Sequence, residues 1–192
     1  MKAFAKGMFS FLLTACFLAT AAFSQGDPRG TSILALRGKS LSVEYGRPSL
    51  SGRTVDEVLG KLPPGALWQV GADTSTTFKT DVDLAFSDVD PTPDSRWTPS
   101  LVIPAGEYSI WMQRQADNSW KLLFDKRHGQ SGEPAPNASE CFASVPLHIS
   151  GPHDLIPREM VTIELDSTKD DRGAGIDILW GTLEARVFFA LK

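Results

Sequence analysis

Hydrophobic residues recur at every second position over most of the chain after residue 40. The runs that show this alternation cover residues 41–45, 76–86, 108–112, 120–124, 161–165 and 176–191. A period of two places alternate side chains on opposite faces of an extended strand, so each run predicts a half-buried strand. Turn-forming segments such as "IPAGE", "ADNS" and "DDRGAG" lie between the runs. We therefore expect an all-β fold, a single antiparallel β-sandwich or barrel-like domain.

One short helix is predicted around residues 54–59. Thr54 and Glu57 have the spacing of a capping box, in which each side chain accepts a hydrogen bond from the other residue's backbone N–H. The apolar face of this helix consists of Val55, Val58 and Leu59. Gly60 is expected to end the helix in a left-handed conformation, and the prolines of "KLPPG" prevent it from continuing.

The first 24 residues have the layout of a secretory signal peptide. Lys2 and Lys6 precede an apolar stretch, and small residues follow up to Ser24. We expect cleavage after Ser24, which leaves one β-rich domain over residues 25–192 that is secreted or periplasmic and has no membrane span. An alternative lies in the same segment, because "LTAC" resembles a lipobox and acylation of Cys16 would produce a lipid-anchored envelope protein.

Composition narrows the range of partners. The chain of 192 residues is long enough to bury one sizeable core. A formal net charge of −4 and the lack of a long basic run argue against nucleic acid as a partner. Once Cys16 is removed, Cys141 is the cysteine that remains, so the domain must be stable without an intrachain disulfide. We expect no cofactor.

The stretch "YGRPSLSGR" offers the strongest candidate for a binding site. It contains Arg47 and Arg53, whose planar guanidinium groups suit carboxylates and other polar acceptors. Tyr45 and Trp68 would form the walls of this site, and Asp73 would orient the arginines. The expected ligand is a small polar molecule or a component of the cell envelope.

A structural role is the alternative for the same stretch. Gly46, Pro48 and Gly52 favour a turn, and the two arginines would then pair with acidic residues or with carbonyl groups of the chain. Both interpretations place this corner of the chain at the end of a strand. They differ in whether a ligand or groups of the protein accept the hydrogen bonds of the two guanidinium groups.

Several motifs occur in a fixed order along the chain: "DPRG", "VEYGRPSLSGR", "LPPGALWQVGADTSTTF", "IPAGEYSIW" and "WKLLFDK". Over roughly residue 27 to the end, this order resembles domain of unknown function 2911, a family of exported bacterial proteins. The chain departs from the family pattern at Gln69, where the family has arginine, and at Asp73, where it has asparagine. The resemblance implies an exported β-rich domain and no particular activity, and the missing arginine weakens the case for an anionic ligand.

Two classes of function remain open from the residues. The first is a non-catalytic exported binding domain. The second is an exported hydrolase that uses Cys141 as nucleophile and His128 as base, or His128 with Asp125. No strand–turn–helix elbow surrounds these residues, and the distance between His128 and Cys141 discriminates between the classes.

No metal site is expected. Two sets of residues have suitable side chains but lack the spacing of zinc or calcium sites: His148, His153 and Asp154, and Asp88, Asp90 and Asp94. Solvated loops account for both sets.

Overall fold

The structure, a computed structural model, describes residues 26–87, 99, 101–129, 135–150, 156–169 and 171–192. Some of the sequence predictions fall outside these residues. They concern the signal peptide over residues 1–24 with Cys16, the three acidic residues between 88 and 94, and the pair His153 and Asp154.

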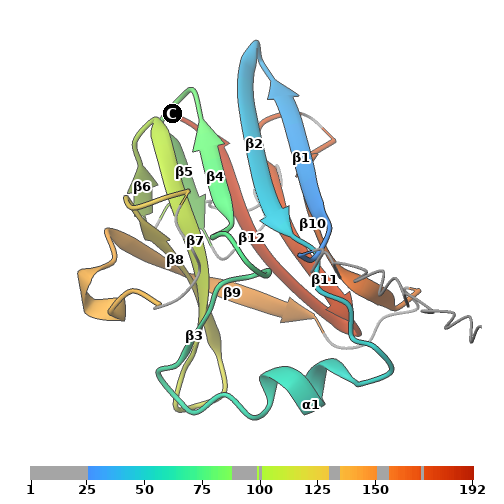
Figure 1. The fold of residues 1–192 in the computed structure, drawn as a ribbon. Coiled ribbons are helices and arrows are strands. Elements are labelled where there is room, and N and C mark those ends of the chain that lie inside the picture. Colours follow the sequence, from blue (N-terminus) through green and yellow to red (C-terminus); the bar gives the residue numbers. More distant parts are fainter. Residues whose placement is uncertain (1–25, 88–98, 100, 130–134, 151–155, 170) are drawn as a thin grey trace, which may run out of the picture.

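Antiparallel strands make up almost all of the regular structure (Figure 1). The strands are β1 Arg29–Leu36, β2 Lys39–Gly46, β3 Leu67–Trp68, β4 Thr77–Thr80, β5 Leu84–Ser87, β6 Leu101–Ile103, β7 Gly106–Arg114, β8 Trp120–Asp125, β9 Ala143–Ser150, β10 Arg158–Ser167, β11 Ala174–Gly181 and β12 Leu183–Leu191. Their order in the sheet is β1-β2-β4-β7-β8-β9-β12-β11-β10, with β3 paired to β7 and β5 paired to β12 and β6. This sheet curls almost into a closed barrel, which confirms the predicted all-β, barrel-like class.

The core fills the inside of this barrel. Phe78, Phe86, Phe124 and Phe189 are fully buried and contact one another in tilted or edge-on pairs, with ring centroids 5.2–6.1 Å apart. Each such ring contributes about 1.5–3 kcal/mol through burial. The rings come from β4, β5, β8 and β12, so they tie together strands that are distant in the sequence.

The predicted run over residues 76–86 is two strands and not one. Thr80 Oγ1 accepts from the Val82 N–H at 3.2 Å and donates to the Val82 carbonyl at 2.7 Å, which folds the backbone into a turn. Asp81 and Asp83 then fix the turn, because their carboxylates accept from the backbone N–H groups of Ser40 and Ala105. Thr80 before this turn and Leu84 after it are both buried, so the alternation of buried positions continues through the turn.

The predicted helix is α1, Val55–Leu59 (Figure 1). Both halves of the capping box between Thr54 and Glu57 are present. The expectation for Gly60 was wrong, since its φ of −63° is right-handed. Its N–H donates to the Asp56 carbonyl, and the Leu62 N–H donates to the Leu59 carbonyl, so a turn prolongs the helix past Leu59. None of the helices among the described residues has the length and apolar character needed to span a bilayer.

The barrel has a seam between β1 and β10, which lie side by side without a hydrogen-bond ladder in the described part of the chain. Side chains take the place of the ladder. Ser32 Oγ accepts from the Leu165 N–H at 3.1 Å, and the Tyr45 hydroxyl donates to the Ile163 carbonyl at 3.3 Å. The Leu165 N–H and the Ile163 carbonyl on the edge of β10 are thereby satisfied although no strand pairs with them.

We predict that Tyr45→Phe lowers the free energy of unfolding by about 1–2 kcal/mol, because the buried Ile163 carbonyl loses its donor. Urea denaturation monitored by tryptophan fluorescence measures this difference. Ser42→Ala, on the same strand and without a described side-chain hydrogen bond, is the control and should change stability little. Equal stability of Tyr45→Phe and wild type would show that the seam does not depend on this bond.

Candidate functional site

The arginine corner, residues 45–53, runs alongside β10 and closes the seam beside Glu159 and Val161. Arg47 donates from its backbone N–H to Pro28 O at 2.7 Å and from Nε to Val161 O at 3.1 Å. Pro48 O accepts from the Val161 N–H at 3.1 Å. Arg47 therefore supplies a charged donor to a strand edge, which is the structural role considered for this stretch.

A close approach of two backbones packs the corner against the segment that follows β3. An added Cβ on Gly46 would lie 2.3 Å from the carbonyl oxygen of Ala72, and one on Gly71 would lie 3.0 Å from the carbonyl oxygen of Gly46. Only glycine at position 46 allows the two chains to come this near. The glycines of "YGRP" and "VGAD" are thus the two sides of one contact.

The other residues of the predicted site have separate partners. Asp73 accepts from the Asp27 N–H at 3.0 Å, and Arg53 Nε donates to the Leu50 carbonyl at 3.0 Å. Trp68 stacks on Trp180, with ring centroids 5.3 Å apart. Across the described residues, no ion pair joins Asp73 to an arginine, because the strand and turn carbonyls serve the arginines instead. Ligand binding at this corner stays a prediction.

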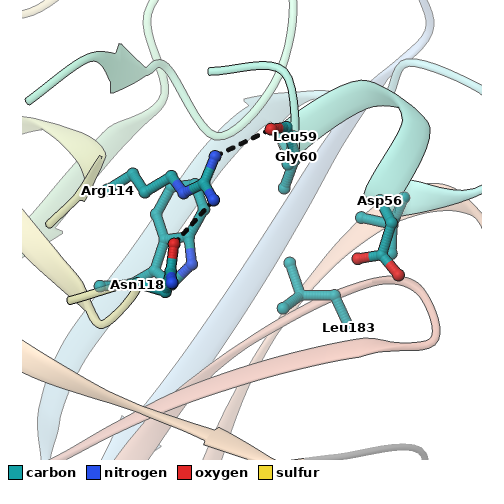
Figure 2. A pocket seen from close by; sticks show the side chains of 8 residues that line it. Asp56, Leu59, Gly60, Arg114, Asn118 and Leu183 are labelled. Atoms are coloured by element: carbon teal, nitrogen blue, oxygen red, sulfur yellow. Dashed lines mark hydrogen bonds between the residues drawn. The ribbon is translucent and has the colours of Figure 1, made fainter. Parts of the chain in front are cut away.

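A pocket of about 220 Å³ lies beside α1 (Figure 2). Its apolar lining consists of Val55, Leu59, Trp120 and Leu183. Its polar lining consists of Asp56, Gly60, Arg114 and Asn118. These residues come from α1, from the β7–β8 hairpin and from the start of β12, so only the folded barrel brings them together. We call this feature the α1 pocket.

Arg114 anchors the helix that forms one wall of the α1 pocket. Its Nη1 donates to the carbonyls of Gly60 at 2.8 Å and Leu62 at 2.7 Å, just past the helix end. Its Nη2 donates to Asn118 Oδ1 at 2.7 Å. A guanidinium has five N–H donors, so Arg114 keeps two of them without a described partner.

The other polar groups of the α1 pocket lie on opposite sides of it. Asn118 stands in the hairpin turn with a left-handed φ of 65°, which asparagine tolerates well. Of its two polar side-chain atoms, only Oδ1 has a described partner. Figure 2 shows Asp56 across the pocket from Arg114. The Asp56 carboxylate has no described hydrogen bond and is exposed. The α1 pocket therefore presents one positive group, one negative group and one amide.

Two tryptophans support the pocket from within the barrel. Trp180 is the cross-strand partner of Leu183, and its stacked neighbour is Trp68. The turn after Trp180 packs directly under α1, since a Cβ added to Gly181 would lie 3.4 Å from Val55 Cβ. Trp180 Nε1 is buried and has no hydrogen-bond partner among the described residues. The wall formed by Val55 and Leu183 thus lies next to an aromatic pair in which Trp180 is buried and Trp68 half-buried.

Cys141 and His128, the two residues of the hydrolase alternative, contact other groups and not each other. Cys141 Sγ lies 3.8 Å from the Asn137 carbonyl, and His128 Nδ1 lies 3.4 Å from a Glu107 carboxylate oxygen. Burial, with a smaller effect from Asp125, raises the pKa of the Cys141 thiol. A raised pKa is the opposite of what activates a cysteine nucleophile. In the part of the chain that the structure describes, no group of three or more His, Cys, Asp or Glu side chains is arranged to hold a metal ion.

Reasoning from the sequence found one wall of the α1 pocket and missed the rest. The predicted helix contains Asp56 and Leu59, but nothing in the sequence connects them with Arg114 or Trp120. The "ADNS" turn was recognised, and its Asn118 was read only as turn chemistry. The available signal was an arginine directly before a hairpin turn, with a tryptophan and not an acidic residue at the facing position of the hairpin.

We predict that Arg47→Ala costs about 1–3 kcal/mol of unfolding free energy, because the Val161 carbonyl loses a charged donor. Arg53→Ala is the matched control. Its side chain is exposed and bonds within its own turn, so the loss should stay below about 0.5 kcal/mol. Chemical denaturation of both variants measures the difference, and equal losses would contradict the assigned role of Arg47.

We predict that iodoacetamide modifies Cys141 slowly at neutral pH, with a rate that rises at higher pH in the folded than in the unfolded protein, because burial raises the pKa of the thiol and disfavours the thiolate. Mass spectrometry of the alkylated protein measures the rate at each pH. The urea-unfolded protein is the control and should show an ordinary thiol profile. Rapid alkylation of the folded protein at pH 7 would contradict this prediction and revive Cys141 as a nucleophile.

Comparison with known proteins identifies the family. Neither the curated proteins nor the solved structures gave a match to this chain. The model of the family described as "Protein of unknown function (DUF2911)" matches residues 27–189. This match includes both the arginine corner and the α1 pocket, and it confirms the resemblance noted in the sequence motifs. Because the match covers most of the chain, the protein belongs to the DUF2911 family.

Proposed function

We propose that this protein is an exported, non-catalytic binding domain and that the α1 pocket receives a small polar ligand. The observation that supports this most directly is the mixed lining of the pocket. Apolar side chains of Leu59, Trp120 and Leu183 stand beside the charged groups of Asp56 and Arg114. Apolar walls with a few polar groups that fix orientation are typical of small-molecule sites.

The hydrogen bonds that hold Arg114 also support the proposal. This arginine is held by three hydrogen bonds to two carbonyls and an amide, and no ion pair involves it among the described residues. Its position is therefore set before a ligand arrives, while two donors remain to be used. Such preorganisation reduces the entropy lost on binding.

The size of the α1 pocket limits the ligand. A volume of about 220 Å³ lies below the range of about 300–1,000 Å³ that is usual for drug-sized ligands. The ligand, or the part of it that enters, is accordingly about the size of a single ring. A longer molecule would extend into solvent from the open side.

Export follows from the N-terminal segment. The basic residues, apolar stretch and small residues of positions 1–24 support secretion, and Cys16 supports lipid anchoring as the alternative way to reach the envelope. The non-catalytic role is supported by the raised pKa of Cys141 and by the contact of His128 with Glu107. The Arg47 and Arg53 corner serves mainly to close the barrel in this proposal.

We predict that small polar compounds shift the backbone amide signals of residues 55–60, 114–120 and 183 in ¹⁵N–¹H NMR spectra of the purified protein. The panel consists of monosaccharides, amino acids, short carboxylates and inorganic phosphate, each at millimolar concentration. Asp56→Ala, which removes a carboxylate without a described partner, should weaken the shifts and leave the fold unchanged.

Two further variants separate the α1 pocket from the arginine corner. Leu183→Trp fills the pocket and should abolish the shifts, whereas Arg53→Ala should leave them as in wild type. Shifts confined to residues 45–53 and 73 would move the binding site to the corner. The absence of saturable shifts with the whole panel would overturn the proposed function.

A further inference from the structure

We propose that the ligand of the α1 pocket is a neutral sugar, of which one pyranose ring enters and lies against Trp120. This inference rests on the proposed function, and it names the class of ligand. It follows from the charge, the hydrogen-bonding capacity and the aromatic wall of the pocket.

The charge of the α1 pocket favours a ligand without net charge. Arg114 contributes one positive charge and Asp56 one negative charge on opposite sides of the pocket (Figure 2). A small anion would be attracted by Arg114 and repelled by Asp56, and a small cation would meet the reverse arrangement. A neutral molecule is repelled by neither group.

The hydrogen bonds of Arg114 leave two of its five donors for a ligand. A carboxylate binds a guanidinium best through two parallel N–H donors. Both hydrogens of Nη1 are already donated, to the carbonyls of Gly60 and Leu62, and Nη2 donates to Asn118. The fork between Nη1 and Nη2 is therefore occupied on its Nη1 side, and the two donors that remain, Nε–H and one hydrogen of Nη2, can each bind a hydroxyl oxygen.

Hydroxyl groups match all three polar side chains of the pocket at once. The Asp56 carboxylate only accepts hydrogen bonds, the remaining Arg114 donors only donate, and the Asn118 amide nitrogen has donors without a described partner. A hydroxyl both donates and accepts, so neighbouring hydroxyls on one ring can serve acceptor and donor in turn. A sugar ring supplies several such groups in a fixed geometry, which limits the entropy lost on binding.

The aromatic wall suits the other side of such a ring. Trp120 lines the α1 pocket and is half-buried, so part of the indole is open to the pocket. It is the cross-strand partner of Arg114, which places aromatic surface and donor side by side on the hairpin. A pyranose has C–H groups on its ring faces and hydroxyls around its rim, which fits an aromatic surface bordered by polar side chains.

The test is ¹⁹F NMR of the protein labelled with 5-fluorotryptophan. The chain contains 5 tryptophans, and Trp120→Phe identifies the signal of Trp120 by its loss. Glucose, galactose and N-acetylglucosamine are titrated separately, with alanine as zwitterion, acetate as anion and glycerol as a polyol without a ring. We expect at least one sugar to shift the Trp120 signal in a saturable manner, whereas alanine, acetate and glycerol do not.

Variants of the polar side chains complete the design. Asp56→Ala should weaken sugar binding about tenfold, the equivalent of one hydrogen bond to a charged group. Arg53→Ala, outside the pocket, should bind as wild type does. Equal affinity of Asp56→Ala and wild type would overturn the assignment of the sugar to this pocket.

The outcomes distinguish this inference from the proposed function. If alanine or acetate shifts the Trp120 signal and no sugar does, the pocket binds ligands but the sugar class is wrong. If glycerol shifts the signal as the sugars do, the inference that the pocket recognises a ring is wrong. If no compound shifts it, or if sugars shift another tryptophan alone, both the inference and the proposed function fail.

Discussion

The seam between β1 and β10 is the contact on which the rest of the barrel depends. The two strands lie together without a ladder in the described chain, and side chains together with the backbone of Pro48 and Leu50 bind the free edge of β10. Tyr45, Arg47 and Ser32 bind the backbone groups of Ile163, Val161 and Leu165. Each bond involves one side chain, so a single substitution can remove it, whereas a ladder would be insensitive to side-chain identity.

The same seam determines where the α1 pocket forms. Beyond Arg47 the chain stays on β10, because the Leu50 N–H donates to the Glu159 carbonyl at 2.9 Å. Leu50 and Val55 then pack on Gly181, which sets α1 over the β11–β12 turn. Arg114 holds the other end of the helix. The arginine corner thus positions the helix that lines the α1 pocket, and the two features are parts of one arrangement.

Several strands were not predictable from alternation. β1 directs Ser32 and Gly30 into the barrel at the seam, where a hydroxyl and a bare backbone are needed, so only the second half of its inward face, Leu34 and Leu36, is hydrophobic. β9 carries Pro146 in mid-strand, at a position that faces β8 but lies outside the residues, 148–150, that pair with β12. The turn at Thr80 was hidden because the alternation continues across it. In each case a local requirement of the tertiary structure replaced the usual residue type.

The sequence by itself determined the fold class, the short capped helix and the family, because these depend on periodicity and on residues close together in the chain. It also located the arginine corner, without deciding what the arginines bind. Only the tertiary structure assigned Arg47 to the edge of β10 and brought Asp56, Arg114, Trp120 and Leu183 to one pocket. The physical reason is the closure of the barrel. Which strands meet, and which side chains then face each other, is set by long-range pairing that no local pattern encodes.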